Sequence, residues 1–182
     1  MKEMTKKEVL EIFDTIDQEL GKTKKKIQIT VLGGSAVILQ DFRERSTRDI
    51  DIAPSANAEL FAKLCKKLDV PVDIITISST VDLAVAKTIP QFSGKYLSVH
   101  SVIAEDLIKL KLERFFKHDP EDIMAIIDKT TFPYLAFKKL FQEMLLDFIG
   151  NPTPLILSAQ EIVERKYSEN IHDFEKLNRI GP

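Results

Sequence analysis

The sequence predicts an α+β protein, with a β-sheet and flanking helices in the first half of the chain and a helical bundle in the second. Three observations support this. Helical and strand patterns alternate in the order αβαβαβ as far as residue 77. Beyond about residue 103 every pattern is helical. The 182 residues, 44% of them hydrophobic and 30% charged, have an ordinary globular composition and suffice for one large domain or a compact core with a small appended bundle.

Charge and cysteine content exclude several classes of protein. The 26 basic and 28 acidic side chains nearly balance, so no overall field holds the chain on nucleic acid or on an acidic membrane. The single cysteine, Cys65, forms no internal disulfide, and nothing points to an oxidising compartment. No apolar run approaches the roughly 18 residues of a membrane span, and no apolar stretch follows the first charged residues. We therefore expect a protein that is neither exported nor membrane-inserted, with the cytoplasm as its location.

Local signals predict the elements up to residue 77. A capping box of Thr5 and Glu8 opens a helix over about 5–20, which Gly21 should end. The other elements follow from alternating β-branched residues or from apolar residues at helical spacing. They are strands over 27–32, 49–52 and 72–77 and helices over 35–42 and 56–68.

Two segments of the first half are less regular. Residues 22–26 form a basic turn, which is more typical of a solvated surface than of a polyanion contact. Within residues 78–102, Gly94 separates the short apolar stretches 84–86 and 96–99, which we interpret as an irregular pair of strands.

The second half consists of helical patterns separated by breakers. Pro120 and Pro133 suit the first turns of helices, and Ser158 begins a second capping box. The predicted helices run over about 104–117, 120–129, 133–149 and 158–178. We therefore expect an α/β core over residues 1–102 and a helical region over 103–182 that packs on it.

Three acidic residues lie on predicted strands. Asp49 and Asp51 are two positions apart, so their side chains project from the same face, and Asp73 lies on the next strand. Like charges so placed repel, which makes a divalent cation their natural partner when they are partly buried. Carboxylate oxygens suit Mg²⁺ or Mn²⁺, and an open site of two or three acids suits substrate phosphates. A solvated edge strand would show the same Asp-x-Asp pattern.

A glycine pair follows the first strand. Gly33, Gly34 and Ser35 open a helix, where backbone N–H groups and the helix dipole favour an anion. No lysine stands where a Walker A motif requires it, and the third glycine of the dinucleotide fingerprint is missing. A tight strand-to-helix turn, with Ser35 as its N-cap, is the alternative.

One combination of these features, over about residues 27–77, resembles the DNA polymerase β-like nucleotidyltransferase superfamily. In chain order it consists of a strand, Gly-Gly-Ser, a helix, an Asp-x-Asp strand and an aspartate on the next strand. The resemblance implies a nucleotidyltransferase-like mixed β-sheet. It also implies that Gly33, Gly34 and Ser35 hold nucleotide phosphates, and that a metal-binding, catalytic set of three acids is present. These acids are Asp49, Asp51 and Asp73.

The chain is more closely similar to the abortive-infection type nucleotidyltransferases, which include toxins of toxin–antitoxin systems. Their Arg-x-Ser/Thr-x-Asp-h-Asp stretch, in which h is a hydrophobic residue, matches residues 45–51. Their helix with the pattern Asp-Leu-Ile, two residues, Lys-Leu matches residues 106–112. An aspartate pair follows, Asp119 and Asp122, with His118 where the family has Lys or Arg. The likeness implies a nucleoside triphosphate substrate, an acceptor that it does not identify and an antitoxin protein as partner.

Helix geometry indicates separately which residues of the predicted helix over 104–117 face solvent and which face protein. Lys109, Glu113 and Lys117 share one side and should pair in solvent. Lys111 and Arg114 lie on a row that faces protein, where two cations favour an anion, and we interpret both as triphosphate contacts. Packing of the stem on apolar surface is the alternative for both residues, and an ion pair is a further alternative for Arg114.

The two aspartates that follow have simpler interpretations. Asp119, before Pro120, is expected to be an N-cap, and Asp122 lies in the same first turn.

The expected function is metal-dependent transfer of a nucleoside monophosphate to an acceptor hydroxyl of RNA, protein or a small molecule. A non-catalytic nucleotide-binding or regulatory module of the same fold is the alternative. A third reading is a helical ribonuclease, because Arg165 and His172, seven residues apart and expected on one helix face, have the Arg-to-His spacing of HEPN nucleases.

Overall fold

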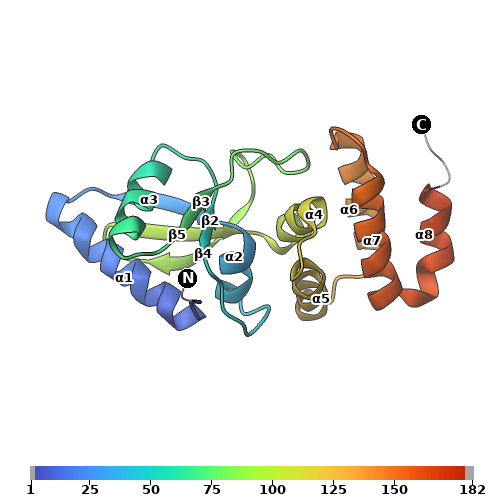
Figure 1. Cartoon of the computed structure of the whole chain (residues 1–182), viewed down its shortest axis with the longest axis horizontal. Coiled ribbons are helices and arrows are strands. Elements are labelled where there is room, and N and C mark those ends of the chain that lie inside the picture. The colour runs from blue at the N-terminus through green and yellow to red at the C-terminus, as the bar shows by residue number, and fades with distance from the viewer. Residues whose placement is uncertain (1–2, 179–182) are drawn as a thin grey trace. The chain divides into compact units, whose positions relative to one another are not determined.

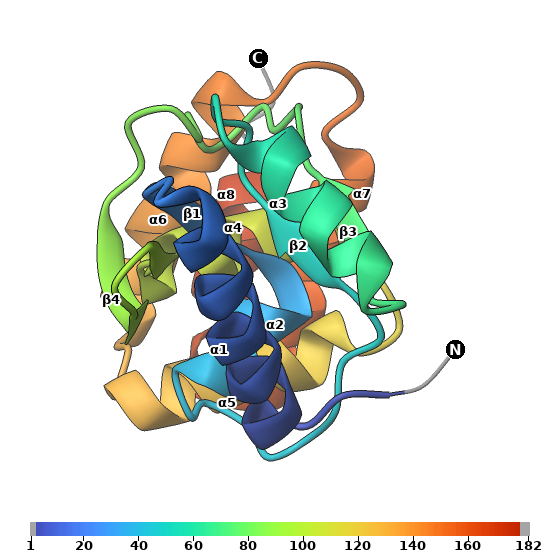
Figure 2. The same ribbon diagram turned by 90° about the vertical axis from the view of Figure 1, so that its left-hand side faces the viewer.

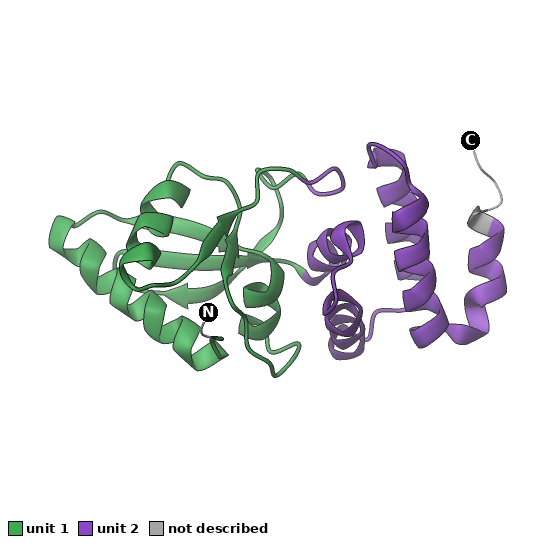
Figure 3. Ribbon diagram, in the orientation of Figure 1, with its two compact units in different colours: residues 1–77, 82–103 green, residues 78–81, 104–182 purple. Residues whose placement is uncertain are grey.

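The computed structural model describes residues 3–178, and the chain forms two compact units (Figures 1 and 3). Unit 1 comprises residues 1–77 and 82–103, and unit 2 comprises residues 78–81 and 104–182. Unit 1 contains a five-stranded mixed sheet with helices, and unit 2 is helical, which confirms the predicted α+β class. The expected packing of a helical region over 103–182 on a core over 1–102 stays a prediction.

The sheet of unit 1 has the strand order β3-β2-β1-β5-β4. Its strands are β1 Ile27–Val31, β2 Ile50–Ile52, β3 Val72–Ile74, β4 Thr88–Ser93 and β5 Leu97–Val102. β1 pairs in parallel with β5 and antiparallel with β2, while β2 and β3 are parallel. The register of β2 and β3 sets Asp51 directly beside Asp73.

Within the described residues, unit 1 has three helices: α1 Lys6–Thr23, α2 Gly33–Leu39 and α3 Ala58–Lys67. α1 and α3 lie side by side over one face of the sheet, as Figure 2 shows. The capping box of Thr5 and Glu8 opens α1 as predicted, but Gly21 does not end it. The helix continues to Thr23, and Lys24 takes the left-handed conformation that terminates it.

Gly21 and Gly94 have packing roles that explain why they are glycines. A Cβ on Gly21 would lie 3.1 Å from the Tyr96 ring, and one on Gly94 would lie 2.3 Å from Oδ1 of Asp17. The Asp17 carboxylate, on α1, accepts hydrogen bonds from the backbone N–H groups of Tyr96 and Leu97 at 2.6 and 2.7 Å. Burial opposes ionisation of Asp17, but these bonds outweigh it and hold the pKa of Asp17 below its usual value. Asp17 thus fastens α1 to the β4–β5 hairpin.

The irregular strand pair predicted within residues 78–102 is present as β4 and β5, with one strand in a different place. The stretch 84–86 lies in a turn over 83–85 and the loop after it, and Val85 is 76% exposed, so that part of the prediction was wrong. The strand begins at Thr88 and contains Pro90, next to a shift in register. β4 is an edge strand, where proline is tolerated because its missing N–H faces away from the ladder.

Unit 2 consists of helices that pack through a shared apolar core. They are α4 Ala104–Arg114, α5 Asp119–Thr130, α6 Tyr134–Asp147, α7 Thr153–Lys166, the 3₁₀ turn Ser168–Asn170 and α8 Ile171–Asn178. α7 packs against α4, α5 and α8. The helices predicted over 104–117, 120–129 and 133–149 are confirmed. α4 ends three residues early, because Phe115 takes a left-handed φ of 45°.

The last predicted helix, over 158–178, was wrong in two respects. The observed helix, α7, begins at Thr153 with a proline in its first turn, so Ser158 is not its N-cap. The Ser158 hydroxyl instead donates to the Pro154 carbonyl inside the helix. The helix also breaks after Lys166, which leaves Arg165 on α7 and His172 on α8. The single helix face on which the ribonuclease reading depended therefore does not exist. None of the helices within residues 3–178 combines the length and apolarity that crossing a membrane requires.

Candidate active site

Three aspartates of unit 1 come together at the β2–β3 pair. Asp49 precedes β2, Asp51 is the middle residue of β2 and Asp73 is the middle residue of β3. One carboxylate oxygen of each lies within 4.8 Å of the others. Exposure differs across the group: the Asp51 side chain is buried, with only 6% exposed, Asp49 is half-buried and Asp73 is exposed. The group therefore has a buried base and an open, solvent-facing side.

Gly33 allows the Asp51 carboxylate to lie where it does. A Cβ on Gly33 would lie 1.7 Å from Oδ2 of Asp51, far inside contact distance. Gly33 also has φ +56°, a left-handed conformation that side chains other than glycine rarely adopt. The position thus requires glycine for both backbone conformation and space, and it joins the end of β1 to the acid group.

Gly34 has a similar role toward the loop that precedes β2. A Cβ there would lie 2.8 Å from a guanidinium nitrogen of Arg45 and 2.9 Å from Oγ1 of Thr47. Thr47 is buried, and its hydroxyl donates to the Asp49 carbonyl at 3.2 Å. Sequence reasoning matched Arg45 and Thr47 to a family motif but gave them no role. They pack on Gly34 and shape the turn that presents Asp49.

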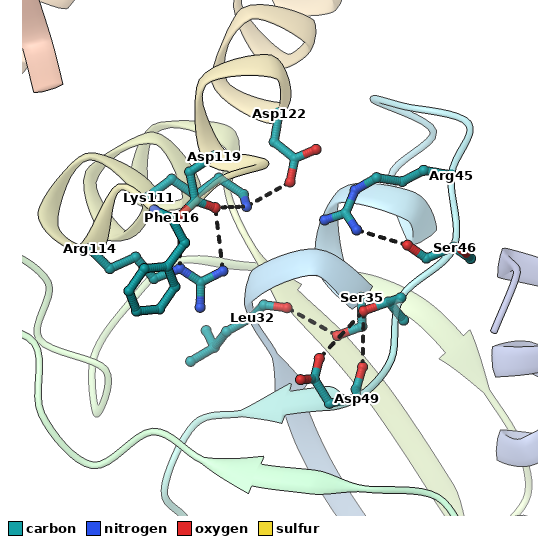
Figure 4. A network of polar contacts seen from close by, with 11 residues as sticks. Leu32, Ser35, Arg45, Ser46, Asp49, Lys111, Arg114, Phe116, Asp119 and Asp122 are labelled. Carbon is teal, nitrogen blue, oxygen red and sulfur yellow. Dashed lines mark hydrogen bonds and ion pairs between the residues drawn. The ribbon is translucent and has the colours of Figure 1, made fainter. Parts of the chain in front are cut away.

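Ser35 is fully buried, and its hydroxyl donates to the Leu32 carbonyl at 3.0 Å (Figure 4). It is not the N-cap of α2, because Leu32 holds that position and makes no side-chain cap. The alternative role expected for Ser35 was therefore wrong. Its contact with a nucleotide phosphate stays a prediction.

The chemistry of the acid group fits a divalent cation. All three ligands are hard oxygen donors, which Mg²⁺ and Mn²⁺ prefer. Magnesium keeps several waters and binds one or two carboxylates together with substrate phosphates. The exposure of Asp73 and the partial exposure of Asp49 leave room for such ligands. Close carboxylates also repel one another, and a cation relieves that repulsion.

In unit 2, Lys111 is the centre of a buried ion network (Figure 4). Its ammonium donates to Oδ1 of Asp119 at 2.7 Å and to Oδ2 of Asp122 at 2.8 Å. The exposed fractions of the three residues are 1%, 2% and 0%. The row of α4 on which Lys111 lies faces protein, as helix geometry predicted, but its pairing with Asp119 and Asp122 was not expected. The network joins α4 to the first turn of α5.

Arg114 and Asp119 extend this network. Nε of Arg114 donates to Oδ2 of Asp119 at 3.2 Å, and the guanidinium lies 5.5 Å from the centre of the Phe116 ring. Asp119 is the first residue of α5, and its carboxylate accepts from the preceding Phe116 N–H at 2.7 Å. An N-cap bonds to amides that follow it, so the N-cap expected at Asp119 was wrong. Asp122 lies in the first turn, as predicted.

Glu113 is a residue whose role sequence reasoning missed. It was expected in solvent with Lys109 and Lys117, but its carboxylate accepts four hydrogen bonds from residues 78–80. Burial opposes ionisation of Glu113, but these bonds outweigh it and hold its pKa below the usual value. Lys109 instead lies 3.8 Å from Glu143 of α6. No sequence signal indicates that the loop after β3 reaches α4.

Comparison with known proteins gives the family. The profile of the family described as "Nucleotidyltransferase of unknown function (DUF6036)" matches residues 7–148. The chain belongs to this nucleotidyltransferase family. The match spans the acid group, the Gly33–Gly34 turn and α4 to α6 of this DUF6036 member. No curated protein and no solved structure matches significantly.

Family membership and the acid group support one another. A nucleotidyltransferase acts on a nucleoside triphosphate, and Asp49, Asp51 and Asp73 form a group that fits the divalent cation such chemistry uses. The recognised family is thus a nucleotidyltransferase family, as the resemblance implied.

Proposed function

We propose that the protein is a metal-dependent nucleotidyltransferase that moves a nucleoside monophosphate from a triphosphate to an acceptor hydroxyl. One observation carries the proposal: three carboxylates converge to within 4.8 Å in a chain of a nucleotidyltransferase family. Asp49, Asp51 and Asp73 hold Mg²⁺, or Mn²⁺ in its place. A divalent cation bound there supplies positive charge that stabilises the phosphate oxygens and lowers the barrier to attack.

The chain's own residues bind and orient the triphosphate. The backbone N–H groups of Gly33, Gly34 and Ser35 contact its phosphates beside Asp51. Lys111 has three ammonium N–H donors, two of which donate to Asp119 and Asp122, and we assign the remaining one to a phosphate oxygen. Arg114 contributes its guanidinium to the same phosphates. These cations offset the charge of the leaving pyrophosphate.

The reaction is an in-line displacement. The acceptor oxygen forms a bond to the α-phosphorus, and the bond from that phosphorus to the β-bridging oxygen breaks, which releases pyrophosphate. The hydroxyl proton passes to a carboxylate oxygen of Asp73, the member of the acid group that faces solvent. Positioning and electrostatics account for the rate, because the protein forms no covalent intermediate.

The biological role that we propose rests on the resemblance to the abortive-infection type, which does not identify the acceptor. That resemblance favours a toxin of a toxin–antitoxin system, with an antitoxin protein as its partner. RNA, a protein hydroxyl and a small molecule are the acceptor classes that this chemistry admits.

Label transfer tests the proposal. The purified chain is incubated with Mg²⁺, cell extract and each nucleoside triphosphate labelled at its α-phosphate. We expect label on one acceptor class, and its loss in the Asp49→Ala/Asp51→Ala double variant, because the phosphates then lose their metal.

Asp14→Ala is the matched control, since Asp14 is an exposed acid of α1. This control should transfer label normally. Transfer that persists in the double variant would refute the site. Mg²⁺-dependent nucleotide binding without transfer to any acceptor would identify a binding module instead.

A further inference from the structure

The turn between α4 and α5, residues 115–118, carries an exposed aromatic ring. Phe116 is 66% exposed, and Lys117 and His118, which follow it, are exposed as well. The whole turn belongs to unit 2. A single exposed apolar side chain needs no explanation of its own. This one differs because the chain around it is fixed and because cations accompany it.

Hydrogen bonds and a left-handed residue hold the turn in one conformation. The Phe116 N–H donates to Oδ2 of Asp119 at 2.7 Å, and the Asp119 N–H donates to the Phe116 carbonyl at 2.8 Å. Asp119 is itself bonded to the buried Lys111. Phe115 takes φ +45°, a conformation that a bulky side chain adopts only where its surroundings enforce it. The backbone that carries the Phe116 ring is therefore fixed in advance of any binding.

One face of the ring is already occupied by a cation. The Arg114 guanidinium lies over the Phe116 ring, 5.5 Å from its centre (Figure 4). Nε of Arg114 also donates to Asp119, which keeps the guanidinium in place. With Arg114 over one face, an exposed fraction of 66% leaves the opposite face of the ring open to solvent. The arrangement is half of a stack, with a flat surface open to a second planar group.

The turn also presents a positive charge to solvent. Lys117 is exposed at its middle. The acids nearest to it in the sequence are each bonded to other groups, and they are Glu113, Asp119, Glu121 and Asp122. The two aspartates among them are buried, so they contribute little to the surface of the turn. A ring and a lysine thus lie next to one another on a rigid, exposed turn.

Such a turn fits one unpaired base of a single-stranded nucleic acid. Bases stack on aromatic rings and on guanidinium planes, and the stack tolerates any base because each base has a π-face. The phosphate next to the base is attracted by Lys117. In a duplex the bases cover one another, so a single strand is required. A protein partner fits less well, because the core of a protein interface is depleted of charged residues, and Phe116 is followed directly by a lysine.

We propose that the turn over residues 115–118 is a binding site for single-stranded nucleic acid. An unpaired base stacks on the open face of Phe116, and the adjoining phosphate contacts Lys117. The inference goes beyond the proposed function, because the site lies wholly in unit 2 and requires neither the acid group nor a nucleoside triphosphate. Charge over the whole chain is nearly balanced, so the attraction is local, and the affinity is expected to fall as salt rises.

Fluorescence anisotropy of a labelled oligouridine of about ten nucleotides tests the site on the full chain. EDTA is present, so no metal held by the acid group contributes to binding. In Phe116→Ala we expect the affinity to be at least about tenfold weaker, the usual effect of losing one base stack. Phe116→Tyr retains a ring and should bind within about threefold of the unsubstituted chain. Lys117→Ala should reduce the salt dependence by about one phosphate contact.

Leu135→Ala is the matched control, because Leu135 is another exposed apolar side chain of unit 2. It should bind the oligouridine as the unsubstituted chain does. The substituted side chains of Phe116, Lys117 and Leu135 are all exposed, so circular dichroism should show each variant folded.

Other strands define the ligand. An RNA duplex of the same length should bind at least about tenfold more weakly than the oligouridine, because its bases are covered. An oligothymidine that binds as well as the oligouridine supports a site for single strands of either kind. Weaker binding of the oligothymidine supports a site that contacts the 2′-hydroxyl.

Four results would overturn the inference. The first is equal affinity in Phe116→Ala and Leu135→Ala, and the second is a loss in Phe116→Tyr as large as that in Phe116→Ala. The third is duplex binding as tight as single-strand binding. The fourth is failure of the unsubstituted chain to bind the oligouridine and the oligothymidine at low salt. None of these results bears on metal binding by the acid group, so the proposed function is tested separately.

Discussion

Replacement of Lys111 by methionine is expected to lower the free energy of unfolding by about 3–5 kcal/mol, the usual cost of removing one partner of a buried ion pair. Lys111, Asp119 and Asp122 are each at most 2% exposed. Without the ammonium, each of the two carboxylates loses a donor, at 2.7 and 2.8 Å, while it remains buried. Urea unfolding followed by circular dichroism measures the change.

A second substitution separates charge from packing. The double variant Lys111→Met/Asp122→Asn removes one negative charge together with the positive one, so it should regain part of the lost stability. The exposed lysine of the same unit, Lys139, provides the control, and Lys139→Met should change stability by less than about 0.5 kcal/mol. A loss below about 1 kcal/mol in Lys111→Met would show that the network does not hold α4 on α5.

Replacement of Gly33 by alanine is expected to abolish metal binding and to destabilise unit 1. The new Cβ would lie 1.7 Å from Oδ2 of Asp51, so the carboxylate must leave its place beside Asp49 and Asp73. The left-handed backbone at φ +56° adds strain of about 1–2 kcal/mol for a residue with a Cβ. Mn²⁺ titration and thermal unfolding measure the two effects.

Gly150 offers a matched control for this substitution. It also has a positive φ, +113°, but a Cβ there meets nothing within 4 Å. Gly150→Ala therefore imposes backbone strain without a clash, and it should leave Mn²⁺ binding intact. If Gly33→Ala binds Mn²⁺ as tightly as Gly150→Ala does, the close approach of Gly33 to Asp51 has no role in the site.

The acid group is the part of the site for which local sequence rules were most informative. Residues two apart on a strand share a face, so Asp49 and Asp51 could be paired from their spacing alone. Asp73 required a further assumption, that its strand lies next to theirs. The parallel register of β2 and β3 satisfies that assumption and sets Asp73 beside Asp51.

Contacts between distant segments were beyond sequence reasoning. Gly33 suggested phosphate binding from its place after a strand, but its contact with Asp51 depends on how β1 pairs with β2. The orientation of Lys111 followed from helix geometry, whereas its partners depend on the left-handed turn at Phe115 that directs α5. Glu113 lies on a charged row typical of solvent, and only the path of residues 78–80 gives it hydrogen-bond partners.

Local helix signals failed where a competing signal was stronger. Ser158 has the spacing of a capping box, but Pro154 in the first turn of α7 starts that helix five residues earlier. Gly21 is a good helix terminator, yet α1 continues to Thr23, and a Cβ on Gly21 would lie 3.1 Å from the Tyr96 ring. In both places tertiary packing or a second local preference decided the boundary.

Direct measurement of Mn²⁺ binding, by electron paramagnetic resonance of the free ion, tests the central claim most directly. We predict that the unsubstituted chain binds Mn²⁺ and that Asp51→Asn, which retains the shape of the side chain, binds at least tenfold more weakly. Asp14→Asn, on exposed α1 surface, should bind as the unsubstituted chain does. Equal Mn²⁺ affinity in Asp51→Asn and Asp14→Asn would contradict the assignment of Asp49, Asp51 and Asp73 as the metal-binding group.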